Sequence, residues 1–217
     1  MIRGVCFDMD GLLIDSEPLG AKMMFKAVEE QGCNLTVEQQ RSSLGMNADA
    51  TKAAMRKWFG DAIDPEQYMS DWFRLMKEYI RENGVPEKTG AREALAALKV
   101  RGVRTALVTS NDPTLVNDYL RLSGFDAYLD FVVTGNQVVH GKPAPDIYLL
   151  AAEKLGLSPD ECAGVEDSLN GVKAIRSAGM LSVMVPDLLP YGETFAPYVD
   201  ICLDSLKELD AALQARA

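Results

Sequence analysis

Short apolar runs alternate with helical segments from about Ala91 to Val185, and this alternation is the strongest constraint on the fold. Glycines such as Gly102, Gly124 and Gly179 follow the helical segments, as is common where a helix ends. Strands that are joined by helices pair in parallel through right-handed crossovers. Together with an apolar run at the amino terminus, the expected strands are residues 3–8, 103–108, 131–133, 162–165 and 181–185. The sequence therefore predicts a parallel sheet flanked by helices.

A block of about 70 residues between the first two expected strands carries only helical signals, and no strand pattern interrupts it. Thr36 and Gln39 match a capping box, Asn47 precedes an alanine-rich run, and Asp64 followed by Pro65 is typical of a helix start. A crossover between parallel strands needs only about a dozen residues, so this block is too long to be a connection. It is therefore expected to form an inserted helical domain.

These patterns predict an α/β protein with a Rossmann-like parallel-sheet core and an inserted helical domain. The core is expected to comprise residues 1–15 and 86–217, and the inserted domain residues 16–85. The hinges are expected in the two linkers, near residues 15–18 and 83–89.

The overall charge limits the possible partners. The 217 residues carry a formal net charge of −10, which opposes binding to a nucleic-acid backbone. No apolar run approaches membrane-spanning length, and the amino terminus has no apolar signal region. We therefore expect a monomeric cytoplasmic protein that binds neither nucleic acid nor membranes, and whose partner is a small phosphorylated metabolite held at a local positive site.

Polar residues follow the apolar runs at the positions where ligands bind in open parallel sheets, beyond the carboxyl ends of the strands. Carboxylates follow the first and fourth strands, hydroxyl and amide groups follow the second, and a lysine lies in the loop after the third. The complete set is Asp8, Asp10, Thr109, Ser110, Asn111, Lys142, Glu166 and Asp167.

Each of these short patterns also has a purely structural interpretation. Asp10 before Gly11 is a common turn, Ser110 with Asn111 and Asp112 could cap the next helix, and Ser168 could cap another. Their joint occurrence on four strand ends favours a site over this alternative.

Two aspartates after the first strand indicate phosphoryl transfer through a covalent carboxylate. Residues i and i+2 of a strand share a face, so Asp8 and Asp10 are expected to face one site while Met9 points into the core. An ionised carboxylate can attack without a base. At about 4 Å from one phosphate charge, however, the electrostatic repulsion on this carboxylate is roughly 4 kcal/mol at an effective dielectric constant near 20.

Counter-charge must offset this repulsion. Asp8, Glu166 and Asp167 offer the hard oxygen ligands that Mg²⁺ prefers, and Lys142 supplies a second positive charge. The Ser110 hydroxyl and backbone amides could hold the phosphoryl oxygens. The second aspartate is suited to protonate the leaving alcohol and then to take a proton from the hydrolytic water.

The stretches DMDGLLIDSE, VTSN, GKPAPD and GVEDSLNG resemble, in this order, the four motifs of the haloacid dehalogenase superfamily. The helical insertion is similar to the α-helical cap of one of its subfamilies, and the resemblance covers essentially the whole chain. It implies that Asp8 is the nucleophile and that Asp10 is the general acid/base. The other implied roles are phosphate binding by Thr109, Ser110, Asn111 and Lys142, and Mg²⁺ binding by Asp8, the Asp10 backbone carbonyl, Glu166 and Asp167.

Phosphatases of sugar phosphates and nucleotides and β-phosphoglucomutase are the near relatives that this resemblance implies. The mutase branch carries a histidine, a lysine and an arginine on its cap, where this chain has Gly20, Leu44 and Ala48. We therefore expect a Mg²⁺-dependent phosphatase that acts on small phosphorylated metabolites through an aspartyl phosphate. The first alternative is a β-phosphoglucomutase, in which Lys52 or Arg56 would substitute for the missing groups.

A second alternative is a non-catalytic protein that binds a phosphorylated metabolite on the same scaffold. Loss of Asp8, Asp10 or Lys142 would favour it. All three residues are present, so the enzyme remains the first choice.

Overall fold

The computed structural model describes residues 1–43, 46, 48–111 and 113–216. Leu44, Asn47 and Asp112, to which the sequence assigned a cap position and two helix starts, lie outside these residues. The chain divides into two compact units, a larger one of Met1–Asp15 with Val85–Ala217 and a smaller one of Ser16–Gly84. Val85 thus belongs to the larger unit, one residue earlier than the boundary drawn from sequence.

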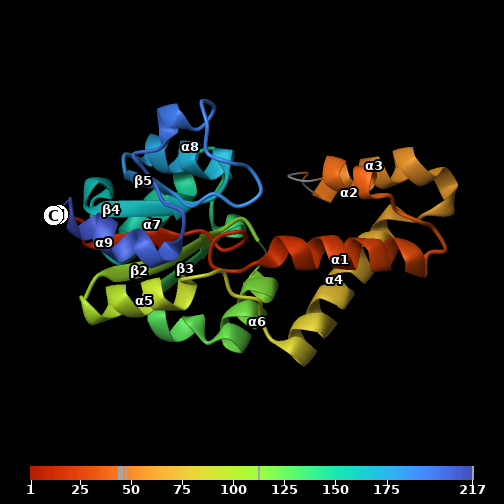
Figure 1. Cartoon of the computed structure of the whole chain (residues 1–217), viewed down its shortest axis with the longest axis horizontal. Coiled ribbons are helices and arrows are strands. Elements are labelled where there is room, and N and C mark those ends of the chain that lie inside the picture. Colours follow the sequence, from red (N-terminus) through yellow and green to blue (C-terminus); the bar gives the residue numbers. More distant parts are fainter. Residues whose placement is uncertain (44–45, 47, 112, 217) are drawn as a thin grey trace. The chain divides into compact units, whose positions relative to one another are not determined.

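The larger unit contains a six-stranded sheet in the order β3-β2-β1-β4-β5-β6 (Figure 1). Every neighbouring pair of strands is parallel, which confirms the predicted α/β class. The strands are β1 Gly4–Phe7, β2 Arg104–Thr109, β3 Phe131–Thr134, β4 Cys162–Glu166, β5 Leu181–Met184 and β6 Ile201–Cys202.

Helices cover both faces of this sheet. The α-helices of the larger unit are α5 Ala91–Val100, α6 Pro113–Ser123, α7 Asp146–Leu155, α8 Leu169–Ala178 and α9 Leu209–Gln214. Helices α7 and α8 pack against each other and on the sheet, and α5 packs on β2 and α9. The core beneath α7 and α8 includes Val108, Val133, Ile147 and Ile175, all fully buried. The strand order places β1 and β4 at the centre of the sheet.

The smaller unit is helical, with α1 Ser16–Glu30, α2 Val37–Ser42, α3 Ala48–Phe59 and α4 Pro65–Asn83. The expected capping box of Thr36 and Gln39 is present, and the Asp64 side chain accepts hydrogen bonds at the start of α4. Helix α1 packs along α4, where Trp72 Nε1 donates to the Gly20 carbonyl at 2.9 Å. The predicted helix starts at Thr36 and Asp64 are thus confirmed, whereas the start at Asn47 lies outside the described residues.

Two elements near the carboxyl terminus escaped the sequence analysis. Strand β6 has two residues and α9 has six, so neither is long enough to show a clear period. Strands β2 and β4 also extend one residue beyond their expected ends, so Thr109 and Glu166 close strands rather than begin loops.

The two segments that connect the units run side by side where they belong to the larger unit. Ile14 and Glu87 form an antiparallel bridge, Asp15 N donates to the Pro86 carbonyl at 2.8 Å, and Lys88 N donates to the Leu13 carbonyl at 3.0 Å. The departing and returning chains are thus paired through their backbones. Among the described residues, no helix is both long enough and apolar enough to cross a bilayer.

Candidate active site

Asp8 continues the hydrogen-bond ladder beyond the end of β1. Its backbone N–H donates to the Val165 carbonyl of β4 at 3.0 Å, and its side chain is buried. The chain then turns, because Leu13 N and Ile14 N both donate to the Met9 carbonyl. Asp10 follows in an isolated bridge with Ile14, and Met9 between the two aspartates points into the core, as the sequence predicted.

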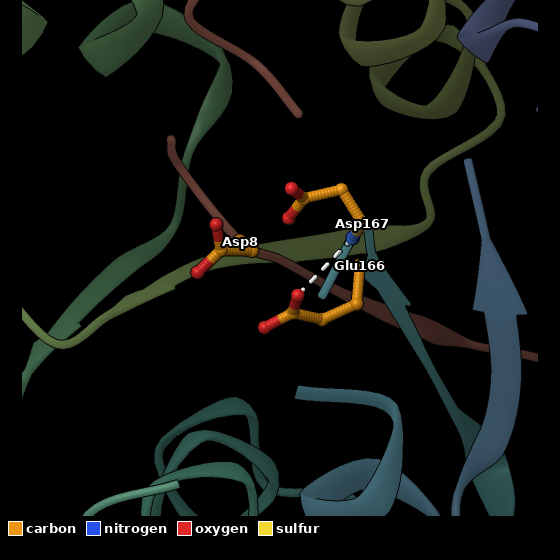
Figure 2. Close-up of side chains that lie close together, drawn as sticks. All are labelled: Asp8, Glu166 and Asp167. Atoms are coloured by element: carbon orange, nitrogen blue, oxygen red, sulfur yellow. Dashed lines mark hydrogen bonds between the residues drawn. The ribbon is translucent and has the colours of Figure 1, made fainter. Parts of the chain in front are cut away.

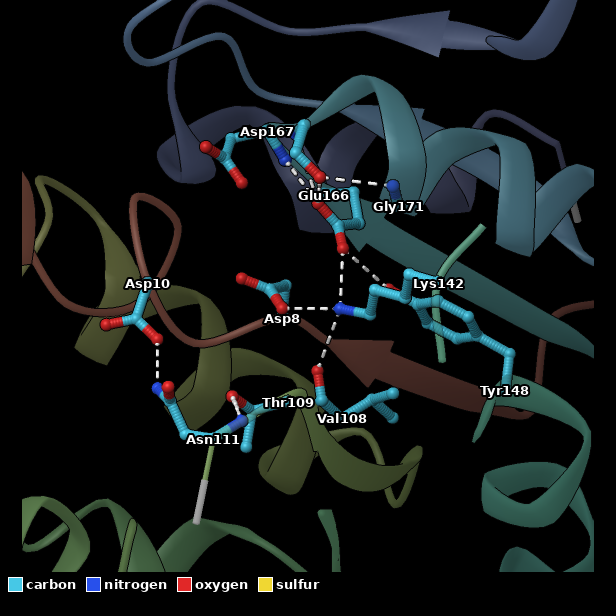
Figure 3. A network of polar contacts seen from close by, with 11 residues as sticks. Asp8, Asp10, Val108, Thr109, Asn111, Lys142, Tyr148, Glu166, Asp167 and Gly171 are labelled. Atoms are coloured by element: carbon cyan, nitrogen blue, oxygen red, sulfur yellow. Dashed lines mark hydrogen bonds and ion pairs between the residues drawn. The ribbon is translucent and has the colours of Figure 1, made fainter. Parts of the chain in front are cut away.

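Lys142 lies at the centre of a buried charge network (Figure 3). Its Nζ donates to Asp8 Oδ1 at 2.5 Å, to Glu166 Oε1 at 2.7 Å and to the Val108 carbonyl at 3.2 Å. The Lys142 side chain is only 8% exposed. An ammonium has three protons, so these three acceptors use its full donor capacity and fix its position.

Glu166 is the most heavily hydrogen-bonded carboxylate of the network. Its Oε1 accepts from Lys142 and from the Tyr148 hydroxyl at 3.2 Å, and its Oε2 accepts from Asp167 N, Ser168 N and the Ser168 hydroxyl. Gly171 makes room for it, because a Cβ at residue 171 would lie 1.8 Å from Glu166 Cδ. Glu166 therefore ties the lysine to the start of α8.

Asp167 completes an acidic cluster with Asp8 and Glu166 (Figure 2). Each residue offers one carboxylate oxygen, and these oxygens lie within 4.8 Å of one another. Gly11 passes close to the cluster with a φ of 74°, and a Cβ there would lie 2.5 Å from Asp167 Oδ2. A residue with a side chain at position 11 would thus be strained and would displace this carboxylate.

Crowding and burial separate the pKa values of the three acids. Burial raises the pKa of Asp8 to about 8, and the Glu166 charge adds to this shift while Lys142 opposes it. Burial also raises the pKa of Asp167 to about 9, with Glu166 and Asp8 adding to it. Burial acts in the same direction on Glu166, but Lys142 and Ser168 outweigh it and its pKa falls below the ordinary value.

These residues fit a divalent cation. Carboxylate oxygens are the hard ligands that Mg²⁺ and similar ions take, and the three oxygens are close enough to share one ion. Burial first, and the neighbouring carboxylates second, raise the pKa values of Asp8 and Asp167, so their ionised forms need more positive charge than one lysine supplies. A cation at this point would offset that charge.

The residues after β2 approach the network from the other side (Figure 3). Asn111 Nδ2 donates to Asp10 Oδ2 at 2.5 Å, and Asn111 N donates to the buried Thr109 hydroxyl at 3.2 Å. Ser110 is exposed, and its backbone packs so closely on Gly135 that a Cβ there would lie 2.8 Å from the Ser110 carbonyl oxygen. The structure thus brings together the sequence-predicted residues on the ends of β1, β2 and β4 and the loop after β3.

Tyr148 is a member of the network that the sequence analysis missed. It is fully buried, its hydroxyl donates to Glu166, and Lys142 Nζ lies 5.2 Å from the centre of its ring. Burial raises the pKa of this phenol well above its usual value, so it remains a neutral donor. Its place in α7, two residues after GKPAPD, was the available signal, but an aromatic residue in an apolar helix predicts core packing first.

A second lysine of the larger unit also lies between two carboxylates. Lys88 Nζ donates to Asp187 Oδ1 at 2.6 Å and lies 3.4 Å from Asp15 Oδ1. We refer to Lys142, Asp8 and Glu166 as the Lys142 cluster, and to Lys88, Asp15 and Asp187 as the Lys88 cluster. The motifs did not point to the second cluster, because neither Lys88 nor Asp187 belongs to one of the four stretches.

Comparison with known proteins agrees with the fold. The family model for haloacid dehalogenase-like hydrolases matches residues 2–179. The chain therefore belongs to the haloacid dehalogenase-like hydrolase family, as the resemblance of its four motifs predicted.

Curated relatives of similar length are named as phosphatases. The chain is 33% identical over 189 residues to a phosphorylated carbohydrates phosphatase of Thermotoga maritima, with 82% of each chain covered. It is 30% identical over 216 residues to hexitol phosphatase B of Escherichia coli K12, covering 97% of this chain and 95% of that one. The family match and these relatives support the predicted enzyme class, a phosphoric monoester hydrolase.

Solved structures share the whole architecture. A Thermotoga maritima protein, provisionally named a β-phosphoglucomutase, superposes with a TM-score of 0.87 at 29% identity and 99% coverage of both chains. The phosphate complex of CbbY from Rhodobacter sphaeroides gives a TM-score of 0.79 at 26% identity and 96% coverage of both. The Rossmann-like α/β fold is thereby confirmed.

Proposed function

We propose that this protein is a Mg²⁺-dependent phosphatase that hydrolyses small phosphorylated carbohydrates through an aspartyl phosphate on Asp8. The observation that carries the proposal is the position of the Asp8 carboxylate. It is bound to Lys142 at 2.5 Å and belongs to an acidic cluster that fits a divalent cation. A nucleophile that must approach a phosphate dianion requires both of these positive charges.

Asp8 attacks phosphorus, and the bond between phosphorus and the ester oxygen breaks. Lys142 holds the attacking carboxylate in one orientation and offsets part of the charge that approaches it. Glu166 keeps Lys142 in place, since both of its oxygens are held by protein donors. Asp8 and Asp167, with the Asp10 backbone carbonyl and Glu166, would hold Mg²⁺, which supplies further charge neutralisation and orients the phosphate.

Asp10 protonates the oxygen of the leaving alcohol and later removes a proton from the water that attacks the aspartyl phosphate. That water breaks the bond between phosphorus and Asp8, and the carboxylate is regenerated. Asn111 is well placed to orient Asp10 through its 2.5 Å hydrogen bond. The exposed Ser110 hydroxyl, the backbone after β2, Thr109 and Asn111 bind the phosphoryl oxygens, and Lys142 contributes its positive charge beside them.

The carbohydrate part of the proposal rests on relatives that are named for phosphorylated carbohydrates and hexitol phosphates. We assign residues 16–84 to the cap that selects the leaving group. The proposed monomeric state and cytoplasmic location are compatible with the acidic surface charge.

A β-phosphoglucomutase is the second candidate, because the structure with 29% identity carries that name provisionally. Two features of the helical unit disfavour it. The Gly20 carbonyl accepts from Trp72, and a Cβ at residue 20 would lie 3.4 Å from the Trp72 ring, so this position packs against an aromatic side chain. Lys52, a possible phosphate clamp, is already paired with Asp49 and Glu66.

The proposed function is tested with a panel of sugar, polyol and small-acid phosphates, each assayed with Mg²⁺ and with excess chelator. We expect phosphate release from several monophosphates with Mg²⁺ and none with chelator. Activity that persists in chelator would contradict the metal-dependent mechanism. Conversion of β-glucose 1-phosphate to glucose 6-phosphate, primed by a sugar bisphosphate and faster than any phosphate release, would establish the mutase instead.

Asp10→Asn provides a test of the proton transfer. We expect turnover to fall by a factor on the order of 10²–10⁴, the usual contribution of general acid–base catalysis. Beryllium fluoride should still bind to Asp8 as a mimic of the aspartyl phosphate, measured by fluorine NMR. Parental turnover in this variant would mean that another group moves the proton.

A further inference from the structure

Asp187 lies after β5 and belongs to none of the four motifs. Its Oδ1 accepts from Lys88 Nζ at 2.6 Å. Its Oδ2 is buried and has no hydrogen-bond partner among the residues that the structure describes. Buried polar atoms almost always have partners, so an unpartnered carboxylate oxygen requires an explanation.

The unpartnered oxygen of Asp187 lies beside the acidic cluster, because the same point next to Gly11 is close to both Asp187 and Asp167. The point where a Cβ of residue 11 would lie is 2.5 Å from Asp167 Oδ2 and 3.0 Å from Asp187 Oδ2. Both oxygens therefore flank one small space that glycine leaves open. The charge of Asp187 also contributes to the raised pKa of Asp167, which agrees with their proximity.

We propose that Asp187 is a positioning residue of the metal site, whose Oδ2 accepts a hydrogen bond from a water on the cation held by Asp8 and Asp167. Mg²⁺ keeps several waters when carboxylates bind it, and those waters need acceptors. A buried acceptor with free capacity beside a metal-binding carboxylate meets that need. This inference rests on the proposed function, because it requires the cation at the acidic cluster.

Lys88 explains how a further carboxylate is tolerated beside Asp167. Its ammonium binds the other oxygen of Asp187, and its backbone N–H is fixed to the Leu13 carbonyl at 3.0 Å. The lysine thus offsets the Asp187 charge through Oδ1 and leaves Oδ2 without a partner among the described residues. The cluster therefore orients Asp187 from a rigid backbone segment.

The test compares Asp187→Asn with a matched control, Asp15→Asn, since both residues pair with Lys88. Calorimetric titration with Mg²⁺ should give a Kd about 10–100-fold weaker for Asp187→Asn, the usual effect of removing an outer partner of a metal site. Asp15→Asn should keep the parental Kd. An unchanged Kd in Asp187→Asn overturns the inference.

A second measurement separates water binding from simple support of the loop. With Mn²⁺ in place of Mg²⁺, oxygen-17 relaxation reports how long water stays on the ion. We expect a shorter residence time in Asp187→Asn, and weaker affinity with an unchanged residence time would overturn the inference. Asp187→Ser serves if the asparagine variant does not fold. A parent protein that binds no Mg²⁺ would refute the proposed function itself, whereas normal binding by the parent and by Asp187→Asn would refute only the role of Asp187.

Discussion

The two lysine clusters of the larger unit have the same composition, one lysine and two carboxylates, but different surroundings. The Lys142 side chain is 8% exposed and its partner Glu166 is 1% exposed, whereas Lys88 is 22% exposed and its partner Asp15 is 41% exposed. The Lys142 cluster is also surrounded by further donors from the backbone, Ser168 and Tyr148. The same charges should therefore contribute more to stability in the Lys142 cluster than in the Lys88 cluster, where Asp187 is 14% exposed but Asp15 is open to solvent.

The largest expected difference between the two clusters is in catalytic activity, when one aspartate of each cluster is replaced by asparagine. Asp8→Asn keeps the shape but removes the attacking charge, so turnover should fall by at least about 10⁴-fold, more than general acid–base catalysis contributes. Asp15→Asn should turn over like the parent. Phosphate release at saturating substrate measures both. Substantial activity in Asp8→Asn would show that the enclosed cluster does not supply the nucleophile.

The next difference is in stability. Lys142→Met leaves Asp8 and Glu166 buried without their counter-charge, which should cost about 3–5 kcal/mol and lower the Tm by roughly 6–20 °C. Lys88→Met should cost less than Lys142→Met, because its partner Asp15 is 41% exposed, although its other partner Asp187 is only 14% exposed and also loses its counter-charge. Scanning calorimetry is the suitable measurement, since both tryptophans, Trp58 and Trp72, lie in the smaller unit. Equal losses in the two variants would mean that enclosure is not what distinguishes the clusters.

The smallest expected difference between the clusters is in stability, when the neutral hydroxyl of Tyr148 is removed from beside the Lys142 cluster and one charge is removed from the Lys88 cluster. Tyr148→Phe removes one hydrogen bond to the charged Glu166 and should cost about 1.5–3 kcal/mol. Asp15→Asn removes a full charge from the open cluster yet should cost less than about 1 kcal/mol. The same calorimetric scans compare them. A larger loss in Asp15→Asn would reverse the order that enclosure predicts.

The sequence predicted most of what local patterns determine. The first five strands and the helical insertion were found because hydrophobic period, caps and glycines are short-range signals. The residues on the strand ends were found because a parallel sheet brings those ends to one edge. The two-residue strand β6 was missed because it is too short to carry a pattern.

Contacts that depend on side-chain placement were not predictable in the same way. Lys142 and Asp8 are 134 residues apart, and the Lys88–Asp187 pair joins segments 99 residues apart. Two motifs pointed to Lys142 and Asp8, whereas neither Lys88 nor Asp187 lies in a motif. The three hydrogen bonds that Glu166 Oε2 accepts and the role of Tyr148 depend on rotamers, which spacing does not specify.

The glycine at position 171 restricts which sequences can encode this site. The Glu166 carboxylate occupies the space that a side chain at residue 171 would need, since a Cβ there would lie 1.8 Å from Glu166 Cδ. In a library with every amino acid at residue 171, selection for activity should return glycine alone, and even alanine should be lost. At Gly141, where a Cβ would meet no atom within 4 Å, the same selection should accept many residues. These two glycines of the larger unit thus permit very different substitutions. The atoms that surround each glycine in the folded protein explain the difference, whereas the sequence alone does not.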